Sequence, residues 1–115
     1  MNEITCDNVL KFDFETIRKS IFSLIDLHVD YVSIDQGQFI YLLGYYPAVY
    51  NYLSELYTFM INKVRQGTES NERLMTGRYR DLRDMFEVAM KSVKLHYDSL
   101  SRKITVLTPN YNRGD

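Results

Sequence analysis

Apolar residues recur at helical intervals along the C-terminal part of the chain. From Tyr79 onward, successive apolar residues are three or four positions apart. They are Leu82, Phe86, Ala89, Val93, Tyr97, Leu100, Ile104 and Leu107. Such steps place side chains on one face of an α-helix, and this stripe is similar to the seam of a coiled coil. The pattern predicts one long helix over residues 79–107, stopped by Pro109 and followed by a loose tail at 109–115.

A second helical pattern occupies the middle of the chain and carries two apolar stripes. One stripe consists of Val49, Leu53, Leu56, Met60 and Val64, and the other of Tyr46, Tyr50, Tyr57 and Ile61. Two stripes on one helix indicate that it is covered on more than one side. Pro47 suits a first helical position and Gly67 a position just past the end, so we expect a helix over 47–66.

The N-terminal part contains weaker signals. Asp13 is a plausible N-cap for a helix over 14–31, whose apolar stripe consists of Phe14, Ile17, Ile21, Leu24 and His28. Ser33 and Gln36 have the spacing of a capping box, which predicts a short helix ending at Gly44. Whether residues 33–43 are helical stays open at this point.

These elements define a fold class. A short polar link, residues 66–71, joins the two long helices, which favours an antiparallel hairpin. We therefore expect an all-α fold: a helical hairpin of 47–66 and 79–107, with one or two preceding helices packed across it. The length of 115 residues and the 45% hydrophobic content suit one domain, which we place at 1–108.

Few residues offer chemistry. His28, His96 and Cys6 lack companions at the spacing of metal ligands or of a nucleophile with its base. The glycines form no phosphate-binding loop. The sequence thus predicts a protein that is not an enzyme, with no catalytic residues, no metal and no cofactor. A lone cysteine, no visible signal peptide and no apolar run near the ~20 residues of a membrane span predict a cytoplasmic protein without membrane contact.

Tyrosine and charge give the functional candidates. The chain has ten tyrosines and no tryptophan, and residues 72–115 carry a net charge of +3 although the whole chain is at −1. Basic side chains along the last helix would neutralise phosphates while tyrosines stack on unpaired bases. The candidate nucleic-acid-binding residues are Arg73, Arg78, Tyr79, Arg80, Arg83, Lys91, Lys94, Arg102 and Lys103. In the alternative interpretation the basic residues form a solvated face, and the tyrosines fill a helix–helix core and a subunit interface at Tyr46, Tyr50, Tyr57 and Ile61.

Two segments carry a resemblance to a known family. Residues 82–104, LRDMFEVAMKSVKLHYDSLSRKI, resemble the closing helix of UvsY-type recombination mediators of tailed phages, and residues 50–57, YNYLSELY, resemble the stretch leading into a basic helix end. The resemblance covers about half of the chain. It implies a small helical protein that forms a ring-like homo-oligomer, binds single-stranded DNA and helps to load a recombinase, in the host cytoplasm. Small size and high tyrosine content equally suit another phage-encoded accessory or virion protein.

Two functional hypotheses follow. The first is a non-enzymatic, self-assembling helical protein that binds single-stranded nucleic acid. The second is a protein–protein assembly element, for example a virion component or an inhibitor of a host factor, without nucleic-acid binding. The basic last helix with its nearby tyrosines and the family resemblance favour the first hypothesis, and the doubled apolar face of residues 46–64 favours the second.

Overall fold

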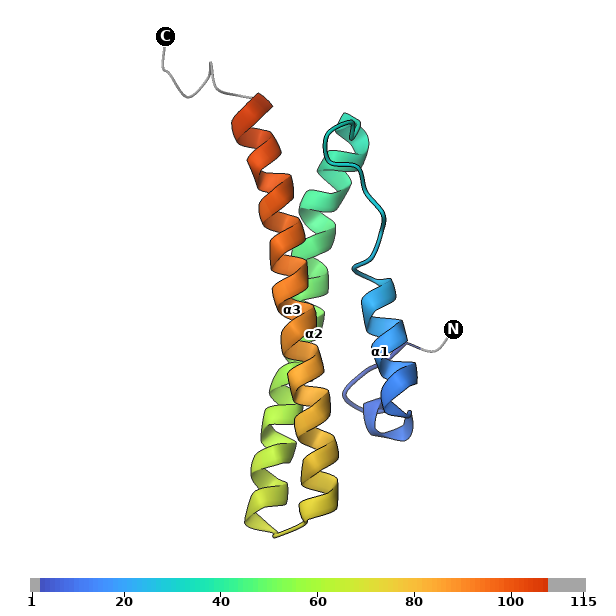
Figure 1. Ribbon diagram of the computed structural model, residues 1–115, viewed down its shortest axis with the longest axis vertical. Coiled ribbons are helices and arrows are strands. Elements are labelled where there is room, and N and C mark those ends of the chain that lie inside the picture. The colour runs from blue at the N-terminus through green and yellow to red at the C-terminus, as the bar shows by residue number, and fades with distance from the viewer. Residues whose placement is uncertain (1–2, 108–115) are drawn as a thin grey trace.

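Two long antiparallel helices make up most of the molecule. The computed structural model describes residues 3–107, and the side chains of residues 3–102. Its elements are the 3₁₀ turn η1 (Val9–Lys11) and the helices α1 (Phe14–Ser23), α2 (Gln36–Glu69) and α3 (Arg73–Leu107). The described residues contain no strand. Helices α2 and α3 lie side by side in a rod of 63 × 30 × 18 Å (Figure 1), so the predicted all-α hairpin is confirmed.

The core lies along the contact between α2 and α3. The apolar stripes expected from the sequence face each other. Their members that are at most 1% exposed are Tyr46, Leu53, Leu56, Met60, Leu82, Phe86, Ala89, Val93 and Leu100. Burying a side chain of this size stabilises a fold by roughly 1.5–3 kcal/mol. Many such contacts along two helices hold the hairpin closed.

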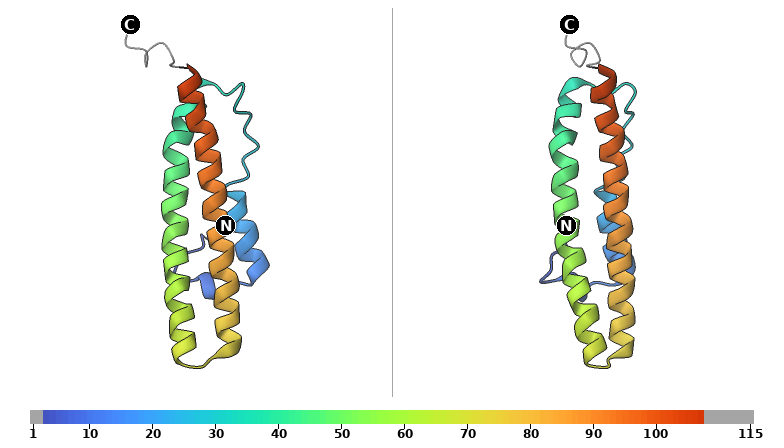
Figure 2. Two further views of the ribbon diagram at one scale, coloured as in Figure 1. Left: turned by 60° about the vertical axis from the view of Figure 1, so that its left-hand side comes forward. Right: turned by 90° about the vertical axis from the view of Figure 1, so that its left-hand side faces the viewer.

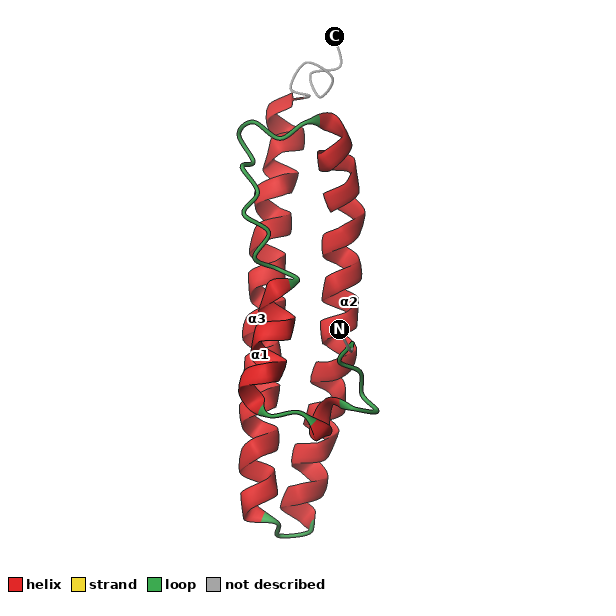
Figure 3. Ribbon diagram, turned by 90° about the vertical axis from the view of Figure 1, so that its right-hand side faces the viewer, coloured by secondary structure: helices red, strands yellow, loops and turns green. Residues whose placement is uncertain are grey.

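Helix α1 and the N-terminal segment pack on one side of the hairpin, which we call the covered face. Figure 3 shows α1 lying over α3 while the N-terminal segment crosses α2. The contact is tight, because Val9, Ile17 and Ile21 are fully buried. Asp13 caps α1 as expected, its side chain accepting from the Thr16 N–H at 2.7 Å. The opposite side, with α2 and α3 in front and α1 behind them in the right panel of Figure 2, is the open face.

Helix α1 is shorter than predicted, ending at Ser23 and not at residue 31. The chain turns at Leu24, whose carbonyl accepts from the Tyr45 hydroxyl at 2.7 Å, and residues 26–35 run as a linker to the start of α2. His28 has a φ of 51°, outside the helical region, and its side chain is exposed. The helix predicted from the apolar stripe of residues 14–28 ends early because the linker has to reach the far end of the hairpin.

Helix α2 is continuous from Gln36 to Glu69, where the sequence predicted a helix over 47–66 and left a separate short helix over 33–43 open. Its N-cap is Asp35, which accepts from the Gln38 N–H at 2.8 Å. The expected capping by Ser33 is wrong, since the Ser33 hydroxyl donates to Asp30. Gly44 does not end a helix, and Pro47 lies inside α2.

An internal proline has a cost that the neighbouring packing offsets. Pro47 has no N–H to donate to the Leu43 carbonyl, and an interior proline destabilises a helix by about 3 kcal/mol. The buried side chains on either side, Leu42, Tyr46 and Val49, keep both halves of the helix against the rest of the molecule.

The turn between the long helices is tighter than predicted. Gly67 does not close α2, which runs on to Glu69, and α3 begins at Arg73 instead of residue 79. A Cβ on Gly67 would lie 2.2 Å from the Thr76 Oγ1, so the close approach of the two helices requires glycine there. Thr76 lies in the first turn of α3. Pro109 and the tail lie outside the described residues.

Candidate functional site

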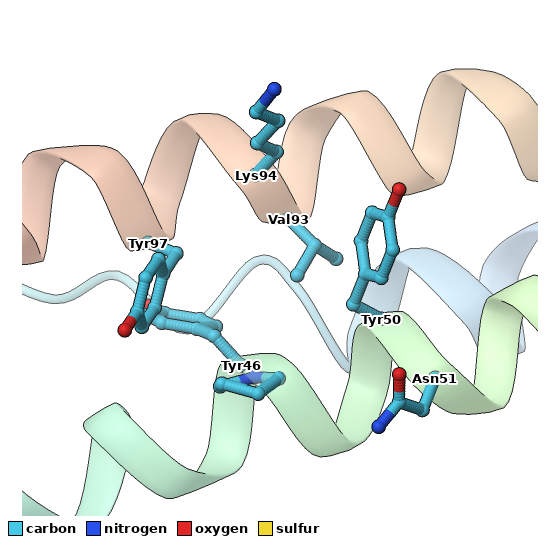
Figure 4. Close-up of a pocket in the computed structure, with 7 residues that line it drawn as sticks. Tyr46, Tyr50, Asn51, Val93, Lys94 and Tyr97 are labelled. Atoms are coloured by element: carbon cyan, nitrogen blue, oxygen red, sulfur yellow. The ribbon is translucent and has the colours of Figure 1, made fainter.

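The open face contains a groove made of two adjoining hollows between α2 and α3. The first hollow has a volume of about 340 Å³. Its α3 wall is formed by Val93, Lys94 and Tyr97, and its α2 wall by Tyr46, Pro47, Tyr50 and Asn51 (Figure 4). The second, of about 240 Å³, is lined by Tyr50, Tyr57, Glu87, Met90, Lys91 and Lys94. Because Tyr50 and Lys94 belong to both, the hollows form one groove.

Aromatic rings form the ends and the middle of this groove. In Figure 4 the rings of Tyr46 and Tyr97 lie at one end of the first hollow and the ring of Tyr50 at the other, while Lys94 extends outward from α3. Tyr50 is 38% exposed, whereas Val93, which lies beside it on α3 in Figure 4, is 1% exposed. The groove thus offers flat aromatic surface above an apolar floor.

A hydrogen-bonded network holds the floor of the groove from behind. The Tyr31 hydroxyl, from the linker, lies 2.6 Å from the Tyr46 hydroxyl and 2.9 Å from Nδ1 of His96. The Tyr46 and His96 rings stack, with centroids 5.8 Å apart and planes at 24°. Burial, followed by the bond to Tyr31, raises the pKa of Tyr46 far above its usual value. Tyr46 is therefore a neutral, fixed part of the floor.

Charge along the groove is positive but partly compensated. The Lys91 ammonium forms an ion pair with Glu87 at 3.1 Å, whereas Lys94 forms none with any residue of the described chain. Further along α3, Arg83 pairs with Asp84 at 2.9 Å. The groove therefore offers one ammonium group, that of Lys94, to an anionic ligand without competition from an ion pair.

The structure separates the predicted nucleic-acid-binding residues into different environments. Arg78 faces the covered side and donates to the carbonyls of Leu10 and Phe12 at 3.1 and 2.6 Å. Tyr79 is buried in the core at 9% exposure. Lys91 and Lys94 lie in the groove. These placements make Arg78 and Tyr79 part of the scaffold.

The other basic candidates lie at the two ends of α3. Arg73 and Arg80 line a separate hollow of about 360 Å³ at the turn, together with Glu72, Thr76 and Gly67. Arg102 is exposed near the end of α3. The side chain of Lys103 lies outside the described residues.

The structure also places the four predicted interface residues in different environments. Tyr46 is buried at 1% exposure, while Ile61 is 39% exposed. Tyr50 and Tyr57 border the groove with the two lysines, so residues predicted for separate purposes come together. Pro47, Asn51 and Met90 complete the lining and were not singled out from the sequence. Finding them requires the register of α2 against α3, which helical spacing within one helix does not contain.

Comparisons with known proteins add no relative. No protein-family model matches the chain, and neither the curated proteins nor the solved structures contain a match. Within residues 3–107, no helix combines the length and apolar character needed to cross a bilayer. The same residues contain no group of three or more His, Cys, Asp or Glu side chains positioned to hold a metal ion.

Proposed function

We propose that this chain is a non-enzymatic, self-assembling accessory protein that binds single-stranded nucleic acid along the groove of its open face. The observation that carries the proposal is the meeting of Tyr50, Tyr57 and Tyr97 with Lys91 and Lys94 in that groove. Aromatic side chains stack on bases for about 1–3 kcal/mol each, and ammonium groups neutralise the phosphates between them. The resemblance to UvsY-type mediators extends the proposal to a role in loading a recombinase.

A single strand suits this groove better than a duplex. The aromatic surface lies in hollows between two helices, and a ring can stack there only if a base leaves its own stack. Bases of a duplex are stacked and paired inside the helix, so they are not available without the cost of unpairing. A duplex would reach only the lysines, through its phosphates.

Fluorescence anisotropy with a labelled single-stranded oligonucleotide tests the proposal. At low salt we expect saturable binding of a dodecamer, and weaker binding of the matching duplex. Each phosphate contact contributes about 0.7 to the slope of log affinity against log salt for a single strand. Replacing Lys94 by Gln should reduce that slope by about 0.7 while the circular dichroism spectrum stays helical. Absence of binding at tens of micromolar protein would refute the proposal.

A second candidate function, protein–protein assembly without nucleic acid, is favoured by apolar exposure at the N-terminal end of α2. Ile40 and Tyr41 are 60% and 63% exposed, and the Tyr41 ring stacks on Tyr45 with centroids 5.6 Å apart. Exposed aromatic residues are enriched at the centres of protein interfaces. Light scattering on the wild type and on an Ile40→Ser, Tyr41→Ser variant tests this candidate. If this candidate is right, the wild type is an oligomer that the double substitution dissociates. A monomeric wild type would rule out self-association.

A further inference from the structure

We propose that the groove is a two-base subsite, which holds two adjacent unpaired nucleobases, one in each hollow, with their linking phosphate at Lys94. This inference rests on the proposed function and specifies its ligand. It follows from three features of the groove: the sizes of the hollows, the position of their shared residues, and the carboxylate of Glu87.

The sizes of the hollows favour one flat ring system each. Pockets for drug-sized molecules usually measure about 300–1,000 Å³. The hollows measure about 340 and 240 Å³, at and below the small end of that range. Each therefore accommodates a fragment such as a base, and neither accommodates a run of stacked nucleotides.

The aromatic walls have a spacing that fits this ligand. Tyr50 and Tyr57 are two helical turns apart, about 10 Å along the axis of α2. A flat ring in van der Waals contact with one aromatic surface lies about 3.5–4 Å from it, so this spacing admits one base stacked on either tyrosine. Tyr50 also borders the first hollow, where Tyr97 lies at the far end. Tyr50 is thus placed to contact both bases.

Lys94 lies where two bases in these hollows would be joined. It borders both hollows, as Tyr50 does, and in Figure 4 its side chain extends outward from α3 on the side away from α2. A strand that passes from one hollow to the other carries its linking phosphate between them. The Lys94 ammonium forms no ion pair among the described residues, and its flexible four-carbon stem lets it turn toward that phosphate.

Glu87 gives the second hollow a chemical preference. Its carboxylate lines this hollow and pairs with Lys91 at 3.1 Å through one oxygen, and its remaining lone pairs can accept from an amino group of a base. Cytosine presents an exocyclic amino group at the position where thymine presents a carbonyl oxygen. The second hollow should therefore prefer cytosine to thymine among the pyrimidines.

Competition against a labelled cytosine dodecamer tests the two-base subsite. The unlabelled competitors are the dinucleoside monophosphate of deoxycytidine, its thymidine counterpart and deoxycytidine monophosphate. We expect the cytosine dinucleotide to be the strongest competitor. The concentration needed for half-maximal competition should be about five-fold or more lower than for the thymidine dinucleotide, because a well-formed base contact discriminates by that much. Deoxycytidine monophosphate should compete at least about ten-fold more weakly than the dinucleotide, because it fills one hollow only.

Matched variants separate the contributions. Tyr50→Leu should weaken binding of the cytosine dinucleotide about ten-fold or more, whereas Tyr50→Phe keeps the ring and should bind normally. Glu87→Gln, whose amide also donates, should abolish the preference for cytosine over thymine. Circular dichroism confirms that each variant is folded.

The outcomes distinguish the two-base subsite from nucleic-acid binding in general. If the dodecamer binds but Tyr50→Leu has no effect, or the mononucleotide competes as well as the dinucleotide, the two-base subsite is wrong and nucleic-acid binding stands. If no oligonucleotide binds the wild type, both proposals fail.

Discussion

The two faces of the α2–α3 hairpin differ in what completes them. On the covered face the chain supplies its own partners, and Val9, Ile17 and Ile21 are buried without measurable exposure. On the open face Tyr50 and Ile61 remain 38% and 39% exposed. The same two helices thus provide a finished core on one side and an aromatic groove on the other. This difference is why we propose the open face as the binding surface.

Hydrogen bonds reinforce this contrast. On the covered face Arg78, Tyr45 and Tyr52 each donate to backbone carbonyls of the N-terminal segment or of the end of α1. Among the described residues, no buried side-chain nitrogen or oxygen lacks a partner. The polar groups of the covered face are therefore committed to the fold, while Lys94 on the open face is available to a ligand.

The largest expected effect comes from truncating a buried side chain on the covered face. Ile17→Ala removes a fully buried side chain from α1 and should lower the free energy of unfolding by about 3 kcal/mol, because a cavity is left behind. Ile61→Ala on the open face is the matched control and should cost less than about 1 kcal/mol. Urea denaturation measures both, and equal losses would contradict the distinction between the faces.

Arg78 gives the next largest effect and separates a structural role from a nucleic-acid role. Arg78→Met leaves the carbonyls of Leu10 and Phe12 without their donor and should lower the free energy of unfolding by about 2 kcal/mol. Oligonucleotide affinity at a temperature where the variant is folded should be unchanged. A loss of affinity with unchanged stability would place Arg78 among the phosphate contacts instead.

Tyr31→Phe tests the network behind the groove. The substitution keeps the ring but removes the hydroxyl that joins Tyr46 and His96, and it should lower the free energy of unfolding by about 1 kcal/mol. Because Tyr46 forms the floor of the first hollow, oligonucleotide binding should weaken slightly. Thermal denaturation and anisotropy measure the two effects, and no change in stability would show that the network is dispensable.

The smallest effect comes from the ionisation of Tyr52 and is confined to alkaline pH. Burial, followed by the nearby Glu3 charge, raises the pKa of Tyr52 from 10.0 to about 12. The unfolded chain therefore loses this proton at lower pH than the folded chain, so the stabilisation is complete below pH 10 and declines between pH 10 and about 12. In Tyr52→Phe, unfolding free energy measured across this range should decline less steeply. Some decline should remain, because the pKa of Tyr46 is also raised.

Local patterns predicted the parts of the fold that local contacts determine. The apolar stripe of α3 and the short polar turn specified the hairpin, and Leu82, Phe86 and Ala89 are buried as expected. The stripe that continued to His28 was misleading, because the end of α1 depends on the Tyr45 contact with Leu24 from a distant helix. Such contacts have no signature in the spacing of residues 14–31.

Helix-breaking residues failed as boundary signals for a related reason. Pro47 lies inside α2 because packing on both sides outweighs the lost hydrogen bond, and Gly67 is needed for its closeness to Thr76. The candidate site was predictable only in its residue types. Lys94 and Tyr50 could be named from the sequence, but their meeting in one groove depends on the register of α2 against α3.

Chemical-shift mapping on the isotope-labelled protein tests whether the open face is the surface that binds a single strand. On addition of a single-stranded cytosine dodecamer, the account predicts that backbone amide shifts change at residues 50–57 and 87–97, which border the groove, and stay unchanged in α1. Changes confined to α1 and the N-terminal segment, or no changes at millimolar oligonucleotide, would contradict the assignment of the open face as the binding surface.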